Sequence, residues 1–408
     1  NQQPLAGGLP NLAEILQRAG YKLGIFGKNH CFTGEQLAQW FDADYSLGSP
    51  AWNQAIPPAL AGTIREYRAW IKEQGGAMMP PKAAPFPAEA GNTHLINQRA
   101  LEFIQAQGAA PFCAWISIPD PHHPIQAPET HVRRVPASGV KLPPFGPRAI
   151  ESKNTRMRIY DWLIRGSELP ESFLREFLRV YYAMTLFIDD ELGRLMDLLD
   201  RRGLAANTIL LFTSDHGDFA AEHHLIIKTG SLLDSLARIP LVVSWPGRIP
   251  AGHREEAPVS QVDIMPTLLG LCGLAAPESV EGRPLPLRQS DSRRAFAYSE
   301  YGAGGPMYTW EDARAIGRAE RLGDYPLGSK TLAGHLQRRE AAGHLRMVRT
   351  NTHKLIVDSN GEREFYDLTK DPHEFANVQG QAAYQSAEAR LQRLLDSEAP
   401  PPRLTPPV

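Results

Sequence analysis

Short apolar strands alternate with amphipathic helices through the first 245 residues, and this alternation constrains the fold more than any other feature. Asn11 caps the first helix, with Glu14 three residues on, and Gly20 ends it. The strands that we expect are Tyr21–Phe26, Pro111–Ile118, Thr208–Thr213 and Ile239–Trp245, and the two longest helices are His94–Gln107 and Glu171–Arg202. Such alternation is typical of parallel sheets. The sequence therefore predicts an α/β fold with a mostly parallel central sheet flanked by helices.

The pattern changes after Pro284, where short strand-like segments follow one another. These segments are Ala295–Glu300, Leu345–Thr350, His353–Asp358 and Arg363–Asp367, and a helix is expected near Tyr384–Leu395. Runs of short strands without intervening helices favour antiparallel pairing. We therefore expect a large α/β domain, which carries the catalytic site, over residues 1–290. A smaller antiparallel α+β subdomain is expected over 291–400 and an extended Pro-rich tail over 401–408.

Composition excludes several classes of protein. Lys plus Arg number 43 and Asp plus Glu 45, so the net charge of −2 provides no basic field for nucleic acid. No apolar run approaches the roughly 18 residues of a membrane span. The three cysteines are too few for a disulfide framework and are expected to be free thiols. The sequence leaves oligomeric state and compartment open: a periplasmic or secreted protein and a cytoplasmic one are both compatible with it.

Ionisable side chains follow three of the expected strands. Lys28 and His30 come after the first, His122 and His123 after the second, and the pair Asp215–His216 after the third. A single histidine near a strand end is more often a surface or hydrogen-bonded residue. The carboxyl ends of parallel strands meet at one edge of a sheet, however, and ligands bind there. Three clusters in this position together predict a functional site.

The third cluster has the chemistry of a metal site. Asp215 offers a carboxylate oxygen and His216 an imidazole nitrogen, a plausible pair of ligands on the tight turn that ends at Gly217. The alternative for Asp215 is a helix N-cap. Lys228 stands thirteen residues after Asp215 and can pair with an ester oxyanion, whereas the alternative is a plain surface lysine.

These residues resemble the ordered signature of sulfatases, a family of the alkaline phosphatase superfamily. The matching motifs are Gly-Lys-Asn-His at 27–30, Pro-His-His-Pro at 121–124, Thr-Ser-Asp-His-Gly-Asp at 213–218, Glu-His-His-Leu-Ile-Ile-Lys at 222–228, and Phe-Tyr-Asp-Leu-Thr-Lys-Asp-Pro-His-Glu at 365–374. Their order covers nearly the whole chain and is far more specific than any one of them. The sequence is also similar to phosphonate monoester hydrolases.

The resemblance implies roles for particular residues. Asp215 and His216 become ligands of one divalent metal ion, with Ca²⁺ as the first candidate and Mn²⁺ as the second. The residues implied to contact the sulfate group or the nucleophile are Lys28, His30, His122 and Lys228, with His123 as a substitute for His122 and His223 and His224 in support. His122 or His30 is implied as general acid for the leaving alkoxide.

The sequence also departs from the family. Sulfatases carry near their N-terminus a paired Asp-Asp that completes the metal site, and a Cys/Ser-x-Pro/Ala-x-Arg motif whose Cys or Ser becomes formylglycine. Neither precedes Lys28, and none of Cys31, Cys113 and Cys272 fits the motif. The adjacent pair Asp189–Asp190 lies inside the long helix, where an exposed or capping role is expected. We expect the nucleophile, and a first strand central to the sheet, to lie outside the given sequence.

Three functions follow from these observations. The first is hydrolysis of a sulfate ester by a metal-activated formylglycine. The second is hydrolysis of a phosphonate or a phosphate mono- or diester on the same scaffold. The third is a truncated, non-catalytic binding protein. In each case the partner is a small anionic ester, whose organic part the sequence does not identify. Loops within residues 42–90, 135–162 and 302–344 are expected to line the entrance and select it.

Overall fold

A computed structural model describes residues 5–144, 149–304, 307, 309–318, 320–322, 325–327 and 343–398. The chain divides into two compact units. Unit 1 comprises the chain up to Lys141, Arg175–Thr208 and Leu268–Glu281. Unit 2 comprises Leu142–Leu174, Ile209–Thr267 and the chain from Gly282 onwards.

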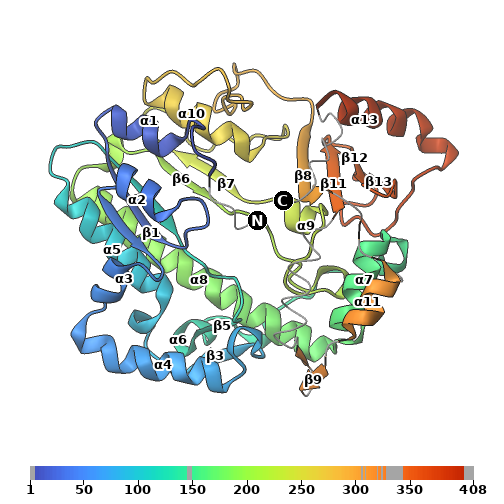
Figure 1. The fold of residues 1–408 in the computed structure, drawn as a ribbon, viewed down its shortest axis with the longest axis horizontal. Coiled ribbons are helices and arrows are strands. Elements are labelled where there is room, and N and C mark those ends of the chain that lie inside the picture. Colours follow the sequence, from blue (N-terminus) through green and yellow to red (C-terminus); the bar gives the residue numbers. More distant parts are fainter. Residues whose placement is uncertain are drawn as a thin grey trace. The chain divides into compact units, whose positions relative to one another are not determined.

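Unit 1 is built on a parallel sheet of three strands in the order β2-β1-β4 (Figure 1). The strands are β1 (Lys22–Gly27), β2 (Ala43–Ser46) and β4 (Phe112–Ser117). Gly27 at the end of β1 lies opposite Ser117 at the end of β4, so the carboxyl ends of these strands meet at one edge. This parallel sheet confirms the α/β fold class.

The core of unit 1 forms where helices cover β1. Leu23 and Ile25 of β1 are buried against Leu16 of helix α1 (Leu12–Arg18) and Trp40 of helix α2 (Gly34–Trp40). Asn11 caps α1 as expected, because its side chain accepts a hydrogen bond from the backbone N–H of Glu14 at 3.0 Å. Helix α5 (Asn92–Ala106) packs against β1 and β4. The helices thus fix the strands whose ends carry the predicted site residues.

The segment 42–90, expected to consist of loops, contains helices. They are α3 (Pro50–Gln54) and α4 (Ala61–Glu73), with β3 (Lys82–Ala84) pairing in parallel with β5 (Gln126–Pro128) before α6 (Glu129–Val132). Helix α4 lacks a side-chain cap, and within it only Ile64 and Tyr67 are buried. That apolar stripe is too narrow to reveal the helix in the sequence.

Helix α8 (Glu171–Arg201) is the long core-facing helix that the sequence predicts. Phe177, Val180 and Met184 along its inner face are fully buried. Asp189 and Asp190 lie on its exposed face, and Asp190 accepts a hydrogen bond from Arg134 at 3.1 Å. The adjacent aspartates therefore have the exposed role expected of them.

In unit 2, β6 (Leu210–Thr213) and β7 (Leu241–Ser244) form an antiparallel pair. The pairing is thus parallel in unit 1 and antiparallel here. The helices of this unit include α7 (Thr155–Ile164), α9 (Asp234–Ala237) and α11 (Trp310–Ile316), and α10 (Ile264–Leu271) starts in it. A short antiparallel pair joins β9 (Glu320–Leu322) to β10 (Tyr325–Leu327).

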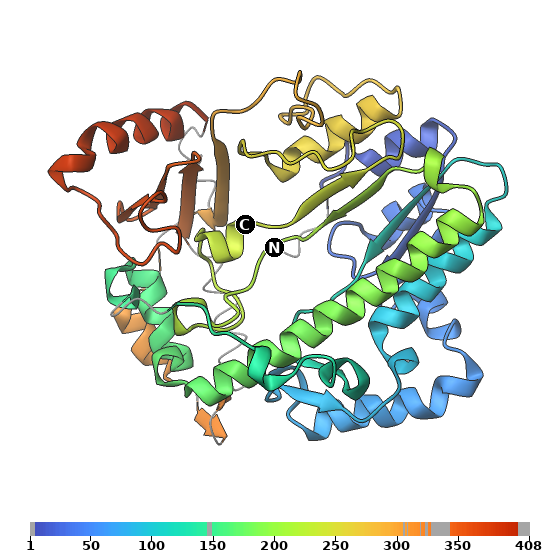
Figure 2. The ribbon, with the colours of Figure 1, turned by 180° about the vertical axis from the view of Figure 1, so that it is seen from behind.

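The C-terminal region of unit 2 is an antiparallel sheet of four strands in the order β13-β12-β11-β8, as the sequence predicts. The strands are β8 (Ala297–Gly304), β11 (Gly343–Arg349), β12 (His353–Asp358) and β13 (Arg363–Asp367). Helix α13 (Gln385–Glu398) packs along β11 and β12 (Figure 2). The predicted tail 401–408, and about half of the segment 302–344, lie outside the described residues.

None of the helices in the described part of the chain combines the length and apolar character that crossing a membrane requires.

Candidate active site

The turn after β1 is fixed by close contact with the end of β4. Gly27 has φ of 93°, and a Cβ there would lie 2.1 Å from the carbonyl oxygen of Ser117, so only glycine fits. The backbone N–H of Lys28 donates to the same oxygen at 2.8 Å. Lys28 is therefore placed directly at the edge where both strands end.

Asn29 shapes the turn that carries His30. Its side-chain oxygen accepts hydrogen bonds from the backbone N–H groups of Cys31 and Phe32, both at 3.0 Å, and its amide donates to the carbonyl of Phe32 at 3.0 Å. This local bonding of an asparagine side chain shapes the turn. His30 is exposed.

The turn after β4 presents two histidines. His122 Nδ1 donates to the carbonyl oxygen of His123 at 2.8 Å, so Nε2 carries the lone pair of a neutral ring. The two rings lie 3.9 Å apart between centroids. Since β1 and β4 are parallel neighbours, the structure brings Lys28 and His30 to the same edge of the unit 1 sheet as His122 and His123.

Asp120 anchors the histidine turn to helix α5. The Thr93 hydroxyl, in the first turn of α5, donates to Asp120 Oδ2 at 2.5 Å. Burial raises the pKa of Asp120 to about 6, and the bond from Thr93 opposes that shift. Asp120 is a buried carboxyl group that sequence reasoning did not single out.

The turn after β6 brings Asp215, His216 and Lys228 together in unit 2. His216 Nδ1 donates to the carbonyl of Gly217 at 2.7 Å, which leaves the lone pair on Nε2. Lys228 Nζ donates to that Nε2 at 2.6 Å. Asp215 Oδ2 lies 3.6 Å from the same nitrogen. One imidazole nitrogen therefore faces both a carboxylate and an ammonium group.

The donor set of this turn fits a divalent metal ion. Ligand bonds of about 2.2 Å allow two donors on one ion to lie up to about 4.4 Å apart, and the separation of Asp215 Oδ2 from His216 Nε2 falls within that range. The bond from Nδ1 to Gly217 leaves Nε2 as the nitrogen that could bind a metal ion, in place of the hydrogen bond that it accepts from Lys228. Among the described residues no group of three or more such side chains forms a complete site. Asp215 and His216 therefore offer two potential ligands.

Asp218 adds a second carboxylate near Lys228. Its side chain accepts a hydrogen bond from the backbone N–H of Ala220 at 3.0 Å. Burial raises its pKa to about 6, while backbone N–H groups and the charge of Lys228 oppose the shift. The sequence places Asp218 three residues after Asp215, but nothing in its pattern distinguishes a buried carboxylate from an exposed one.

The loop between Asp218 and Lys228 has an unusual backbone. Five non-glycine residues adopt positive φ: Ala220, Ala221, His223, His224 and Ile227. Such a run is strained and persists only where the surroundings hold it. His223 is buried between the rings of Phe219 and Phe375, and burial lowers its pKa to about 3. Burial also lowers the pKa of His224.

The sequence Ser244-Trp-Pro-Gly-Arg248 matches the Ser-x-Pro-x-Arg pattern of formylglycine sites, although it lies far from the N-terminus. Ser244 pairs with Leu210 at the start of β6, whereas Asp215 follows the end of that strand. The extended strand runs from Leu210 to Thr213, roughly 10 Å at about 3.3 Å per residue, before the turn that carries Asp215. Ser244 is therefore not the nucleophile of the Asp215–His216 site.

Comparisons with known proteins identify relatives of this chain. The chain is 29% identical over 422 residues to the multifunctional alkaline phosphatase superfamily protein PehA of Trinickia caryophylli, a match that covers 94% of this chain and 78% of PehA. For three further sulfatase relatives the match spans only 37 to 54% of the relative's own length.

Two solved structures share the fold. The phosphonate monoester hydrolase SpPMH from Silicibacter pomeroyi aligns with a TM-score of 0.72 and 20% identity, over 98% of this chain and 81% of that chain. BT4656, solved in complex with its substrate D-glucosamine-2-N,6-O-disulfate, aligns with a TM-score of 0.67 and 20% identity, over 97% and 82%. The fold is that of the alkaline phosphatase superfamily.

Within that superfamily, the sulfatase family model matches residues 1–274. The chain belongs to the sulfatase family, which places it among the sulfuric ester hydrolases. Members of this family use a divalent metal ion.

Proposed function

We propose that the protein hydrolyses a sulfate ester at the site that contains Asp215, His216 and Lys228. The observation that carries this proposal is the contact of His216 Nε2 with both Lys228 Nζ, at 2.6 Å, and Asp215 Oδ2, at 3.6 Å. A carboxylate and an imidazole lone pair suit a metal ion, and a lysine beside them suits the negative charge of an ester oxygen. An oxyanion next to a metal ion and a lysine is stabilised by both.

The remaining predicted residues receive roles in the same reaction. Lys28 and Lys228 neutralise non-bridging sulfate oxygens, and His122 contacts the sulfate, with His123 as its substitute. His122 or His30 donates a proton to the leaving alkoxide. His122 fills this role with its ring protonated: Nδ1 donates to the His123 carbonyl, and Nε2 carries the proton that passes to the leaving oxygen. The nucleophile that we propose is the formylglycine of the family.

Asp215 and His216 would hold the metal ion. We propose Ca²⁺, with Mn²⁺ as the second candidate because an imidazole nitrogen is a softer ligand than oxygen. When bound, the ion supplies Lewis-acid stabilisation of negative charge. The Nδ1 bond from His216 to Gly217 orients the ring for this purpose.

A second function deserves a direct comparison, hydrolysis of a phosphonate or a phosphate mono- or diester. Support for it comes from the nitrogen ligand His216 and from the fold shared with SpPMH. Sulfate monoesters carry one negative charge, and so do phosphonate monoesters, so Lys28 and Lys228 suit either group. Because BT4656 acts on a sulfated amino sugar, sulfated sugars are the first natural substrates to test.

The experiment is a side-by-side assay of one aryl sulfate, one aryl phosphonate monoester and one aryl phosphate at equal concentration, with Ca²⁺ and then with Mn²⁺. We expect the highest kcat/KM for the sulfate. We expect Lys228→Ala to lower kcat roughly 100-fold, the usual effect of removing one oxyanion-stabilising group. A higher kcat/KM for the phosphonate would establish the second function instead. No turnover of any ester would support a binding protein.

A further inference from the structure

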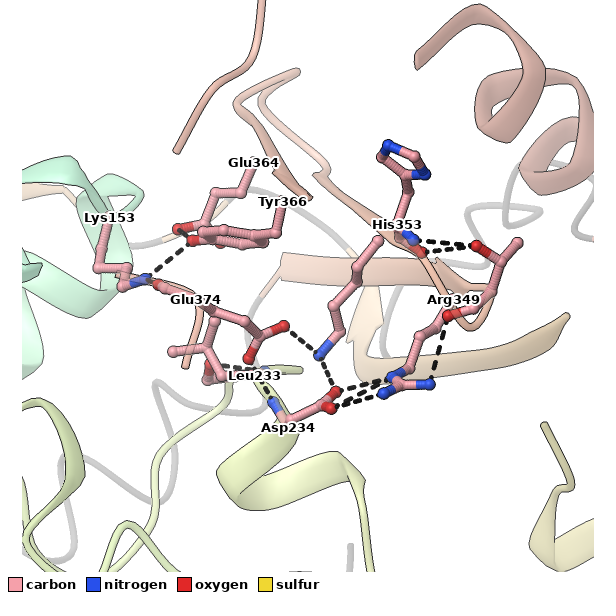
Figure 3. A network of polar contacts seen from close by, with 11 residues as sticks. Lys153, Leu233, Asp234, Arg349, His353, Glu364, Tyr366 and Glu374 are labelled. Atoms are coloured by element: carbon pink, nitrogen blue, oxygen red, sulfur yellow. Dashed lines mark hydrogen bonds and ion pairs between the residues drawn. The ribbon is translucent and has the colours of Figure 1, made fainter. Parts of the chain in front are cut away.

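Lys354, the second residue of β12, is a fully buried cation held between two carboxylates. Its side chain has 0% exposure, and its Nζ lies 2.7 Å from Asp234 Oδ1 and 2.7 Å from Glu374 Oε1. The two carboxylates, Asp234 and Glu374, are labelled in Figure 3. A buried lysine is stable only with such partners, because removing an ammonium group from water is costly.

The same carboxylates are held by further groups. Arg349 of β11 contacts Asp234 Oδ2 at 3.0 Å, and the backbone N–H of Asp234 donates to Glu374 Oε2 at 2.6 Å. Lys153 donates to the carbonyl oxygen of Glu374 and contacts the hydroxyl of Tyr366 at 3.0 Å (Figure 3). Asp234 is therefore bound through its side chain and its backbone.

Asp234 is the first residue of helix α9, and α9 supports the turn that carries the metal ligands. The backbone N–H of Gly217 donates to the carbonyl of Leu236 at 2.8 Å. A Cβ on Gly217 would lie 2.0 Å from the carbonyl oxygen of Ser235, so the two backbones are in closest contact there. Gly217 in turn accepts the Nδ1 hydrogen bond of His216. Contacts through α9 thus connect Lys354 to His216.

A second connection reaches the strained loop before Lys228. The ring of His223 packs on Phe375, the residue after Glu374, at 5.5 Å between centroids. Glu222 lies 3.8 Å from His373, the residue before Glu374. Residues 373–375 therefore contact the loop that ends at Lys228, while Glu374 itself binds Lys354.

We propose that Lys354 is a positioning residue for the site formed by Asp215, His216 and Lys228. It holds α9 in the place that sets the Gly217 backbone and hence the direction of His216 Nε2. The expected effect of Lys354 on metal binding rests on the proposed function, whereas its effect on the position of α9 and Gly217 does not. A gain in stability does not explain the ion pair, since well-packed apolar residues commonly replace such pairs without loss of stability. The ion pair is explained by its fixing of the position of α9 against the C-terminal sheet.

The test compares Lys354→Met with Leu395→Ala, a matched control. Leu395 is fully buried on α13 in the core that includes Leu355, the neighbour of Lys354 in β12, so its loss weakens the same sheet without touching Asp234. Hydrogen exchange of a peptide covering Thr213–Phe219 reports on the Gly217 amide, and calorimetric titration of the full chain with Mn²⁺ reports on the metal ligands.

We expect Lys354→Met to raise exchange in the 213–219 peptide at least tenfold and to weaken Mn²⁺ binding about tenfold, the lower end of the range for removing a group that orients a metal ligand. Leu395→Ala should change exchange in β11 and β12 but leave both of these readouts as in the wild type. Equal changes in the two variants, or no change in the peptide with Lys354→Met, would overturn the proposal.

Asp234→Asn keeps the contact to Lys354 while weakening it, so it serves if Lys354→Met does not fold. We expect intermediate exchange in the 213–219 peptide, and wild-type exchange there would overturn the proposal. Absence of Mn²⁺ binding by the wild type would contradict the proposed metal site alone, because the exchange measurement decides the positioning role independently.

Discussion

The turns after β1 and after β6 both carry proposed site residues, but they are held in place by different means. The first is held by the neighbouring strand β4, because Gly27 and Lys28 contact Ser117, and by Asn29, which bonds residues two and three positions on. The second depends on α9, which is bound by Glu374, 140 residues away along the chain. The comparison teaches that the first turn depends on the parallel sheet of unit 1 and on its own asparagine, whereas the second depends on the C-terminal sheet.

The largest difference should appear when the ion network itself is broken. Glu374→Ala leaves Lys354 buried with one carboxylate fewer, and we expect a loss of about 3–5 kcal/mol in the free energy of unfolding at neutral pH. The control Glu388→Ala removes the partner of Arg363 at a site that is partly open to solvent, and about 1 kcal/mol is expected. Denaturant titration followed by circular dichroism measures both. Equal losses of unfolding free energy in the two variants would contradict the claim that the Lys354 ion network stabilises the fold more than an exposed ion pair does.

A pH series should show two contributions of opposite sign, one from Asp120 and one from Asp234. The pKa of Asp120 is raised from 3.8 to about 6 in the folded protein, so folding favours its protonated form and stability declines as pH rises from 3.8 through 6. The difference of about 2 pKa units corresponds to about 3 kcal/mol. Asp120→Asn should lack this decline, as measured by unfolding at pH 4 and pH 7.5. An unchanged pH dependence would show that Asp120 is not the titrating group.

Asp234 should behave in the opposite way. Burial would raise its pKa, but the charges and hydrogen bonds of Lys354 and Arg349 outweigh burial and lower the pKa to about 2. A lowered carboxyl pKa stabilises the fold above pH 3.8, and that stability is lost as pH falls towards 2. A stability profile that falls on both sides of about pH 4 therefore reports on Asp120 and Asp218 above that pH and on Asp234 below it.

The smallest effect is expected in the first turn. Asn29→Ala removes the side-chain bonds to Cys31 and Phe32, and we expect a loss of about 1–2 kcal/mol in the free energy of unfolding. Because the bonds of Asn29 lie within the turn itself, hydrogen exchange should change in the peptide around His30 and not in the peptide 213–219. A change of hydrogen exchange in the peptide 213–219 would show that the two turns are not held independently.

The sequence predicted these two regions to different depths. Apolar runs marked β1, β4 and β6 because each is a short strand bounded by turn residues, and the motif order pointed to Lys28, His122 and Asp215. Helix α4 was missed because only Ile64 and Tyr67 are buried in it. Asp120, Asp218 and Lys354 were also missed, since burial of a charged group depends on partners far away in the sequence and leaves no local pattern.

The most direct test of the account is the rate of aryl sulfate hydrolysis by His216→Ala, with His253→Ala as control because His253 hydrogen-bonds the Pro286 carbonyl in another part of unit 2. We predict that chelation abolishes wild-type activity and that a divalent ion restores it. His216→Ala should lose roughly 100-fold or more in kcat/KM, without recovery in excess metal, whereas His253→Ala stays near the wild type. Wild-type kcat/KM in His216→Ala would contradict the central claim.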